Sequence, residues 1–552
     1  MRILAASVGN CVHTAGIQAF LEIARTLGHD TVFLGPAVPI KRLVSSIIEH
    51  KPDAVAVSYR LTPESAKAVF EDLKSEIARN PEIKNRKFYF GGTAPVAAVA
   101  VQTGMFDACF NGSEPEKAVV FLLQGTSLVK RSSEYASDLV PRIRNSQPLP
   151  LIRHHFGLPS MQDTIEGARR IAESGLLDIL SIAPDQNAQE SFFRPQEMDP
   201  RLAGAGGVPL RSPADLQAIR EATRTGSFPL LRCYSGTRDL VKWGEMLEET
   251  ISVAWGAVPL TWYSELDGRS KRPIKEAIAE NQQAIRWYAE HDIPVEVNES
   301  HQWALRRSGD VVELATAYLA AYNAKALGVN NYVCQFMFDT PRGISPAMDI
   351  AKMLAKAELV ESIKNGEFNV IRMVRSGLTS FSPSANVAKG QLATSVYTAM
   401  ALRPHIVHVV GYSEADHVAT PEEVIESCEI ARGAITKALL GGARPETDPK
   451  VMVRKANLLE EARYLLDAIK RLKKSSSHDP LTSPETIAEA IKEGLLDASD
   501  LRGSGIARGK IVTAIVDGAC VAVSSTNGKP IDEKERISEL AVSEHDLDLA
   551  EI

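Results

Sequence analysis

Cysteine is scarce in this sequence, and its six cysteines stand singly, at residues 11, 109, 233, 334, 428 and 520. No two of them form a Cys-x-x-Cys pair, so the sequence has no signature of a zinc site or an iron–sulfur cluster. Their spacing does not predict a disulfide framework either. A reducing cytoplasm is therefore the expected compartment.

Basic tracts and long apolar runs are also missing. The net charge of −7 argues against an electrostatic grip on nucleic acid or on anionic lipid. No apolar run reaches the ~20 residues that a membrane-spanning helix needs, and the segment 1–6 is too short for the apolar core of a signal peptide. We therefore expect neither nucleic acid nor a membrane as a partner.

What is present is a long chain of ordinary globular composition, with 44% apolar and 24% charged residues. A chain of 552 residues exceeds one ordinary domain, so two or three domains are expected. Residues 1–125 alternate short apolar strands, ending near residues 7, 34, 58, 90 and 111, with amphipathic helices. This alternation predicts an α/β domain with an open, doubly wound parallel sheet (Rossmann-like), which binds ligands beyond the carboxyl ends of its strands.

The remainder divides into three segments. Residues 126–147 are polar and lack a clear period, which indicates a linker. Residues 148–442 contain eight strand-then-helix units, with strands ending near residues 155, 183, 234, 260, 298, 338, 374 and 410. Eight such units predict a (β/α)₈ TIM-like barrel, with two stacked open sheets as the alternative. Residues 443–552 are expected to form a small helical, α+β cap.

Polar and glycine-rich loops follow the strands of the first domain. They contain Cys11, His13, Thr14 and Gly16 after the first strand, Ser58 and Arg60 at the third, Gly91, Gly92 and Thr93 at the fourth, and Gly112 and Ser113 at the fifth. Imidazole is a suitable ligand for a transition metal, and glycines let the backbone close on a flat ligand. A loop histidine is more often solvent-facing, and Gly-Gly is common turn chemistry. The joint placement of these residues on the right strand ends favours the functional interpretation.

These residues resemble the cobalamin-binding domain that methionine synthase shares with carbon-skeleton mutases. Its pattern is D-x-H-x-x-G, then S-x-L, then G-G; this chain supplies His13 and Gly16, Ser58, and the pair Gly91 and Gly92. The resemblance implies cobalamin, with the histidine as the lower cobalt ligand and the nucleotide tail beside the serine and glycines. Cys11 stands where the family has aspartate, and Arg60 where it has leucine. A thiol is a weak partner for the imidazole, so ligation of cobalt by His13 stays open, with Asn10 or a backbone carbonyl as other acceptors.

Two arginines mark the expected mouth of the barrel. Arg153 lies near the end of the first barrel strand, and Arg232 near the end of the third. A guanidinium stays charged and binds a carboxylate through paired hydrogen bonds, so the pair predicts a small carboxylate-containing substrate. The alternative is a structural salt bridge to a loop acid.

Other polar residues follow the later barrel strands. Tyr263 is a possible hydrogen-bond donor, and Glu265 is a possible acid or base if burial shifts its pKa. Asn298, Glu299 and His301 are further polar contacts expected after the fifth strand. Core packing explains the neighbouring tryptophans equally well.

By pattern, the barrel also resembles the large subunit of glutamate mutase (methylaspartate mutase). In that family, arginines at the positions of Arg153 and Arg232 bind the substrate carboxylates, and a tyrosine near the position of Tyr263 lies in the active site. The third family arginine is replaced here by the segment 185–189, and the family's glutamate base has no counterpart in the segment 253–255. Glutamate itself is therefore not the expected substrate.

Three functions are compatible with these features. An adenosylcobalamin-dependent isomerase, acting by radical rearrangement, is favoured. A corrinoid-dependent methyltransferase is the alternative, disfavoured because the first domain starts at Met1 and leaves no room upstream for the helical cap of such modules. A non-catalytic cobalamin sensor or carrier ranks last, because an arginine-lined barrel exceeds its needs. A homodimer through the charged helix expected at 448–474 is a further expectation.

Overall fold

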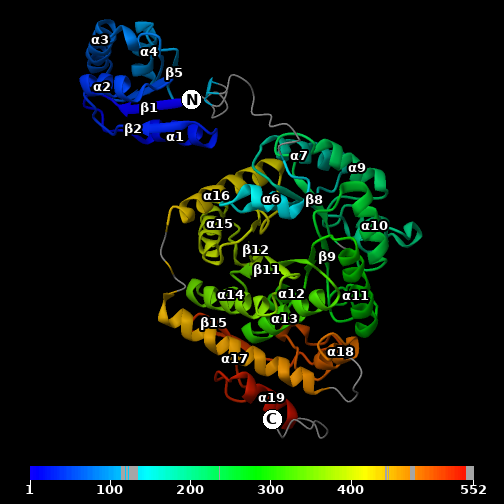
Figure 1. Cartoon of the computed structure of the whole chain (residues 1–552). Coiled ribbons are helices and arrows are strands. Elements are labelled where there is room, and N and C mark those ends of the chain that lie inside the picture. Colours follow the sequence, from blue (N-terminus) through cyan, green and yellow to red (C-terminus); the bar gives the residue numbers. More distant parts are fainter. Residues whose placement is uncertain are drawn as a thin grey trace. The chain divides into compact units, whose positions relative to one another are not determined.

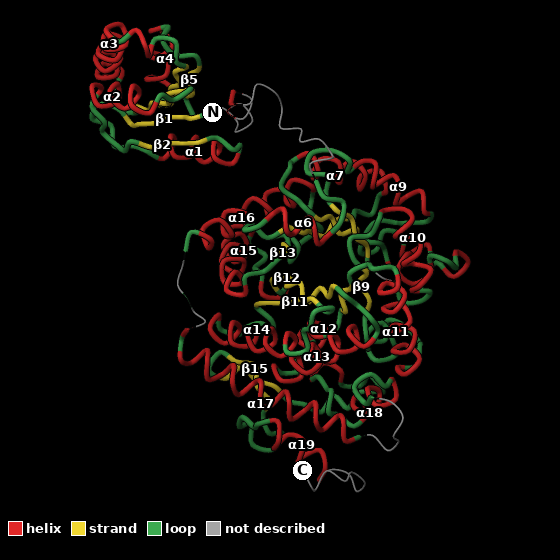
Figure 2. The backbone as a smooth tube through the Cα atoms, viewed as in Figure 1, coloured by secondary structure: helices red, strands yellow, loops and turns green. Residues whose placement is uncertain are grey.

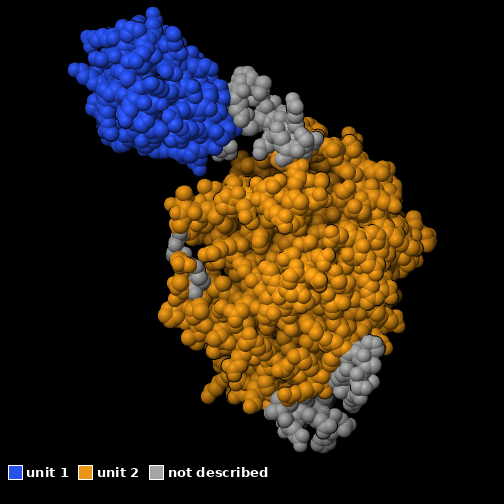
Figure 3. Space-filling view, in the orientation of Figure 1, with its two compact units in different colours: residues 1–129 blue, residues 130–552 orange. Residues whose placement is uncertain are grey.

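Within residues 1–112 of the computed structural model, short strands and helices alternate as predicted (Figure 1). The elements are β1 (Arg2–Ser7), α1 (Ala15–Thr26), β2 (Asp30–Phe33), α2 (Ile40–His50), β3 (Ala54–Tyr59), α3 (Pro63–Arg79), β4 (Lys87–Gly92), α4 (Ala94–Thr103) and β5 (Ala108–Phe110). The structure describes residues 1–112, 119, 122–123, 135–234, 236–441, 444, 447–472 and 479–542. The chain divides into two units, Met1–Val129 and Lys130–Ile552 (Figure 3).

The sheet of the first unit is parallel, with the strand order β2-β1-β3-β4-β5. Alternate residues of β1 enter different apolar clusters: Leu4 and Ala6 pack into one, Ile3 and Ala5 into the other. The sheet is thus covered on both faces, as its continuous apolar strands predict. The strand order reverses between β1 and β3, and in such sheets ligands bind beyond the carboxyl ends of the strands at this point.

The second unit contains eight parallel strands ringed by helices (Figure 2). The strands are β6 (Leu151–Phe156), β7 (Ile179–Ile182), β8 (Leu230–Cys233), β9 (Gly256–Val258), β10 (Val295–Val297), β11 (Asn331–Phe338), β12 (Asn369–Ser376) and β13 (Ile406–Val409). The helices are α7 (Met161–Glu173), α8 (Gln186–Ser191), α9 (Pro213–Ala222), α10 (Leu240–Ile251), α11 (Ile274–Glu290), α12 (Ser300–Leu305), α13 (Asp310–Ala326), α14 (Pro346–Glu361), α15 (Ala385–Ala399) and α16 (Pro421–Leu439). Each predicted strand end lies within two residues of the observed one. The α/β architecture with a TIM-like barrel is therefore confirmed.

The barrel is nearly closed. Its strand order is β8-β7-β6-β13-β12-β11-β10-β9, and β8 and β9 form the two edges. A backbone hydrogen bond bridges this seam, because the N–H of Ala254 donates to the carbonyl of Leu231 at 2.8 Å. Closure of this kind removes most of the exposed strand edge that an open sheet would present.

Apolar side chains fill the barrel at the amino ends of its strands. Leu151, Ile179, Leu230 and Ile406, each at or near the start of its strand, belong to one buried cluster. Helix α6 (Leu139–Ser146) adds Leu139 and Ile143 to the same cluster. The floor of the barrel is thus apolar, and polar groups are left for the carboxyl ends of the strands.

Helix α6 falls within residues 126–147, which were expected as a linker. Arg142 on this helix donates to the carbonyls of Phe228 (2.6 Å) and Ser227 (3.3 Å) at the barrel floor. The helix is stabilised by these tertiary contacts, which a local periodicity search does not detect.

The C-terminal segment forms three helices and a hairpin within the described residues. They are α17 (Pro449–Arg471), α18 (Pro484–Lys492), β14 (Thr513–Val516), β15 (Ala519–Ala522) and α19 (Glu533–Val542). Helix α17 packs against α13 and α14 of the barrel. Among the described helices, none combines the length and apolar character needed to cross a bilayer.

Candidate functional site

A cavity of about 650 Å³ lies at the carboxyl ends of the first sheet. It is lined by His13, Gly16, Ser58, Arg60, Gly91, Gly92, Thr93 and Gly112, among other residues. The structure thus brings together eight of the residues selected from the sequence. Thr14 is the N-cap of α1 and is not in this lining, and Ser113 lies outside the described residues.

Two adjacent glycines line this cavity, and the lack of a side chain has a different consequence at each. A Cβ at Gly92 would lie 2.5 Å from the carbonyl oxygen of Tyr59, so only glycine fits there. A Cβ at Gly91 would meet nothing within 4 Å. Gly91 therefore leaves open space in the cavity, where a ligand group can approach the bare backbone.

A pair of serines connects β3 to the histidine loop. Ser7 Oγ donates to the carbonyl of His13 at 2.9 Å, and Ser58 Oγ lies 2.6 Å from Ser7 Oγ. Since the proton of Ser7 is used toward His13, Ser58 is the donor in the second bond. Ser7, which sequence reasoning missed, thus links Ser58 to the main chain at His13.

The exposed imidazole of His13 has one side-chain contact within the described residues. Its Nδ1 lies 3.9 Å from Cys11 Sγ, and Cys11 is fully buried. Asn10 Oδ1 accepts from the Tyr59 hydroxyl at 2.9 Å, and no hydrogen bond joins it to His13 among the described residues. The thiol therefore lies beside the imidazole, at the sequence position where the cobalamin-binding pattern has aspartate.

A second cavity, of about 190 Å³, lies inside the barrel. Its lining includes Arg153, His155, Tyr234, Tyr263, Arg269, Glu296, Asn298, His301, Gln302, Gln335 and Arg375. Of the four predicted catalytic residues, Arg153 and Tyr263 line this cavity. Arg232 and Glu265 do not.

Arg153 and Arg232 share one carboxylate. Glu296 Oε2 lies 3.3 Å from Arg232 Nη2 and 3.9 Å from Arg153 Nη1, and it accepts from the Trp255 indole at 2.8 Å. All three charged side chains are at most 1% exposed. Burial, and then the neighbouring Arg232, holds the pKa of Arg153 well below its ordinary value. The structural salt bridge that was the alternative for these arginines is thus present, with Glu296 on a strand rather than a loop acid.

Histidines around the cavity are neutral at pH 7. Burial, followed by nearby arginines, lowers the pKa values of His155, His301 and His408 well below the usual range. The Tyr234 hydroxyl lies 2.8 Å from His155 Nε2, and the two rings stack 4.7 Å apart. The positive charge of the cavity therefore comes from guanidinium groups, with imidazoles as uncharged hydrogen-bonding partners.

Tyr263 lies on a tightly held loop after β9. Burial raises the pKa of its hydroxyl, which stays protonated and can donate a hydrogen bond. Glu265, expected as an acid or base, instead accepts from the backbone N–H of Ile274 at 2.9 Å. Ile274 is the first residue of α11, so the carboxylate satisfies a free helix N–H and offsets the helix dipole.

Sequence reasoning missed several residues of this cavity. One of them, Arg375 on β12, is the register partner of His408 on β13, which in turn pairs with the predicted Arg153 on β6. Strands lie ~4.8 Å apart, so the Cα atoms of Arg153 and Arg375 are about 10 Å apart. The available signal was a charged residue inside an otherwise apolar strand, which is rare unless the side chain is paired or functional.

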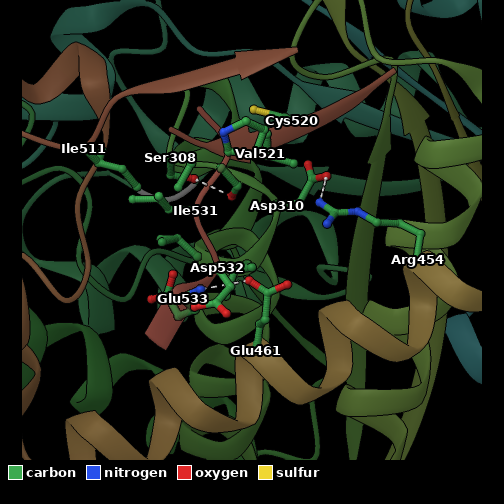
Figure 4. Close-up of a pocket in the computed structure, with 15 residues that line it drawn as sticks. Ser308, Asp310, Arg454, Glu461, Ile511, Cys520, Val521, Ile531, Asp532 and Glu533 are labelled. Atoms are coloured by element: carbon green, nitrogen blue, oxygen red, sulfur yellow. Dashed lines mark hydrogen bonds and ion pairs between the residues drawn. The ribbon is translucent and has the colours of Figure 1, made fainter. Parts of the chain in front are cut away.

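A third cavity, of about 220 Å³, lies between α13, α17 and the C-terminal segment (Figure 4). Its charged groups are already engaged: Asp310 Oδ2 accepts from Arg454 at 2.9 Å, and Glu461 accepts from the backbone N–H of Glu533 at 3.1 Å. These bonds fix the C-terminal helices to the barrel. A structural role is therefore enough to explain the charged residues that line this cavity.

Comparison with known proteins identifies the first unit. Residues 1–120 match the family model of the B12 binding domain. Cobalamin is thus the cofactor of this unit, and the open backbone at Gly91 and the gathered loops fit such a ligand.

The matches to individual proteins are partial. The beta subunit of D-ornithine 4,5-aminomutase from Acetoanaerobium sticklandii is 28% identical over 131 residues, which are 22% of this chain and 17% of that protein. A cobalamin-binding protein from Desulfitobacterium hafniense is 26% identical over 23% of this chain and 59% of its own, with a TM-score of 0.19. A 2,3-dimethylmalate lyase is 13% identical over 61% of this chain and 97% of its own, with a TM-score of 0.28. The two structural likenesses are too weak to say more about this chain.

Proposed function

We propose that this chain is an adenosylcobalamin-dependent isomerase, similar to carbon-skeleton mutases, that acts on a small carboxylate-containing substrate. The observation that carries the proposal is one chain with both a B12-binding domain and a barrel whose cavity is lined by arginines. The partial match to an aminomutase subunit supports the same class of reaction. We also propose that the barrel is related to the large subunit of glutamate mutase.

The first unit would hold the cofactor. Ser58, Gly91, Gly92 and Thr93 would line the pocket for the nucleotide tail, and His13 would be the residue to ligate cobalt. The Ser58–Ser7 pair fixes the main chain of the histidine loop, and Cys11 orients the imidazole. When bound, adenosylcobalamin supplies the radical chemistry.

The barrel would hold the substrate. Arg153 and Arg232 share one carboxylate, Glu296, and Arg375 also lines the cavity, so guanidiniums outnumber carboxylates there and the interior favours an anion. The protonated Tyr263 hydroxyl would donate a hydrogen bond to the group that migrates. Nε2 of Gln335 is buried with no hydrogen-bond partner among the described residues, and it would donate to the substrate. Enclosure by the barrel excludes water, which protects a reactive substrate species from side reactions.

The experiment is a radical assay on the full chain. The protein is loaded with adenosylcobalamin, mixed with a series of small carboxylic acids, and examined by electron paramagnetic resonance. A signal from cobalt(II) coupled to an organic radical is expected with at least one acid. Methyl transfer without a radical would instead support a corrinoid methyltransferase, and cofactor binding with neither would support a sensor.

A further inference from the structure

The arginines of the barrel cavity differ in how their nitrogens are used. Arg153 donates from Nε to Ser181 Oγ at 2.7 Å, and its Nη2 lies 3.0 Å from His155 Nε2. Its Nη1 lies 3.0 Å from the sulfur of Met373. Every nitrogen of the Arg153 guanidinium is therefore already engaged within the protein.

Arg232 is similarly committed. It is fully buried, its Nη2 faces Glu296, and its guanidinium packs over the rings of Tyr234 and Trp255 at 5.1 and 5.3 Å. Only its Nε lacks a hydrogen-bond partner in the described part of the chain, and Arg232 does not line the cavity. A single buried N–H cannot form the paired bonds through which arginine grips a carboxylate.

Arg375 is different. Its one hydrogen bond within the described residues runs from Nε to the carbonyl of Ser376 at 3.3 Å, so both Nη groups remain available. It is half-buried, lines the cavity and has no carboxylate partner in the part of the chain that the structure describes. Its charge is felt by His155, His301 and His408, whose pKa values it lowers, so it sits among the polar groups of the cavity.

We propose that Arg375 is the specificity-determining residue that binds the substrate carboxylate, while Arg153 and Arg232 hold Glu296. The two free Nη groups of Arg375 match the two oxygens of a carboxylate. Gln335 Nε2, on the neighbouring strand β11, supplies a further donor. The identity of the ligand as a substrate rests on the proposed function, whereas the binding itself does not require cobalamin.

The test is a calorimetric titration of the full, cofactor-free chain with butyrate, and with uncharged butyramide as the matched probe. Wild type is expected to bind butyrate and not butyramide. Arg375→Met should weaken butyrate binding by at least about tenfold, as loss of a charge-assisted pair does. The control Arg286→Met removes the same charge from an exposed position on α11 and should change nothing.

Two outcomes would overturn the proposal: no binding of butyrate by wild type, or unchanged binding by Arg375→Met. If Arg375→Met does not fold, as judged by its thermal transition, Arg375→Lys decides the question. Lysine keeps the positive charge but cannot form the two parallel hydrogen bonds of a guanidinium, so the affinity of this variant for butyrate should fall at least about threefold. An unchanged affinity for butyrate would count against the proposal. Failure here leaves the radical assay unaffected, so the two proposals can fail separately.

Discussion

Glu296 lies within 3.3 Å of Arg232, and both side chains are sealed inside the barrel. Removing the acid leaves Arg153 and Arg232 as buried cations without a counter-charge. We expect Glu296→Gln to lower the free energy of unfolding by about 3–5 kcal/mol, the usual cost of breaking a buried pair. Urea denaturation of the full chain measures this change in unfolding free energy, with Glu276→Gln on the exposed face of α11 as the control. A change below about 1 kcal/mol would mean that Glu296 does not carry this charge.

Gly91 offers a clean way to block the cofactor. Its Cβ would meet no atom within 4 Å, so Gly91→Leu should leave the fold of the first unit intact while its side chain enters the cavity. We expect retention of cobalamin after gel filtration, followed by visible absorbance, to fall at least about tenfold. Gly390→Leu, at an equally open position in α15, is the matched control. Normal retention by Gly91→Leu would place the cofactor elsewhere.

His13 and Cys11 can be examined by spectroscopy. In the cobalt(II) state, ligation by His13 should give a three-line nitrogen splitting, which His13→Ala should abolish. Cys11→Asp should make the imidazole a stronger donor, because a carboxylate raises ligand basicity more than a thiol does. The cobalt midpoint potential should then become more negative, by about 59 mV for each tenfold gain in ligation, as for a one-electron couple.

Two results would contradict this assignment. A nitrogen splitting that persists in His13→Ala would show that another group ligates cobalt. A potential that does not move in Cys11→Asp would show that the 3.9 Å contact does not orient the ring.

Asp349 makes stability depend on pH in a direction that can be stated in advance. Burial raises its pKa to about 7, against attraction from Lys352. The folded state therefore holds a proton that the unfolded state has released above about pH 4. Its contribution to stability is complete below that pH and is lost as pH rises toward 7.

The matched variant is Asp349→Asn, which does not titrate. The difference in unfolding free energy between wild type and variant should change by up to about 1.4 kcal/mol per pH unit between pH 5 and 7. Wild type should become less stable relative to the variant as the pH rises. Urea titrations at several pH values measure this difference. A difference that stays constant with pH would show that Asp349 is ionised throughout.

The strands could be predicted because each is a short apolar run followed by a polar loop. The parallel order and the barrel followed from the alternation with helices. Helix α6 could not be predicted in the same way. Its two apolar residues, Leu139 and Ile143, are buried only because they pack against the barrel floor. Pro141 lies between them, and a proline is not expected inside a helix.

The residues of the candidate site also divide into those that could be predicted from the sequence and those that could not. Ser58, Gly91 and Gly92 were accessible to sequence reasoning because they stand at or near strand ends, and Arg153 because it is a charged residue within an apolar strand. Arg375, next to the end of β12, and Glu296, inside β10, were missed, and their meeting in one cavity depends on the register of neighbouring strands. Glu265 had the right chemistry, but the loop directs its carboxylate to the start of α11.

The loop that carries Tyr263 sets a limit on how the barrel can adapt. Tyr263 has a left-handed backbone (φ +57°), a conformation that costs a non-glycine residue about 1 kcal/mol or more. Its N–H donates to Asp267, and its carbonyl accepts from Arg272 at 2.9 Å, so both sides of the residue are fastened. A bulkier ligand therefore cannot gain space by pushing this wall outward. Changes in the accepted ligand size would have to arise from substitutions on other strands that line the cavity, such as β11 and β12.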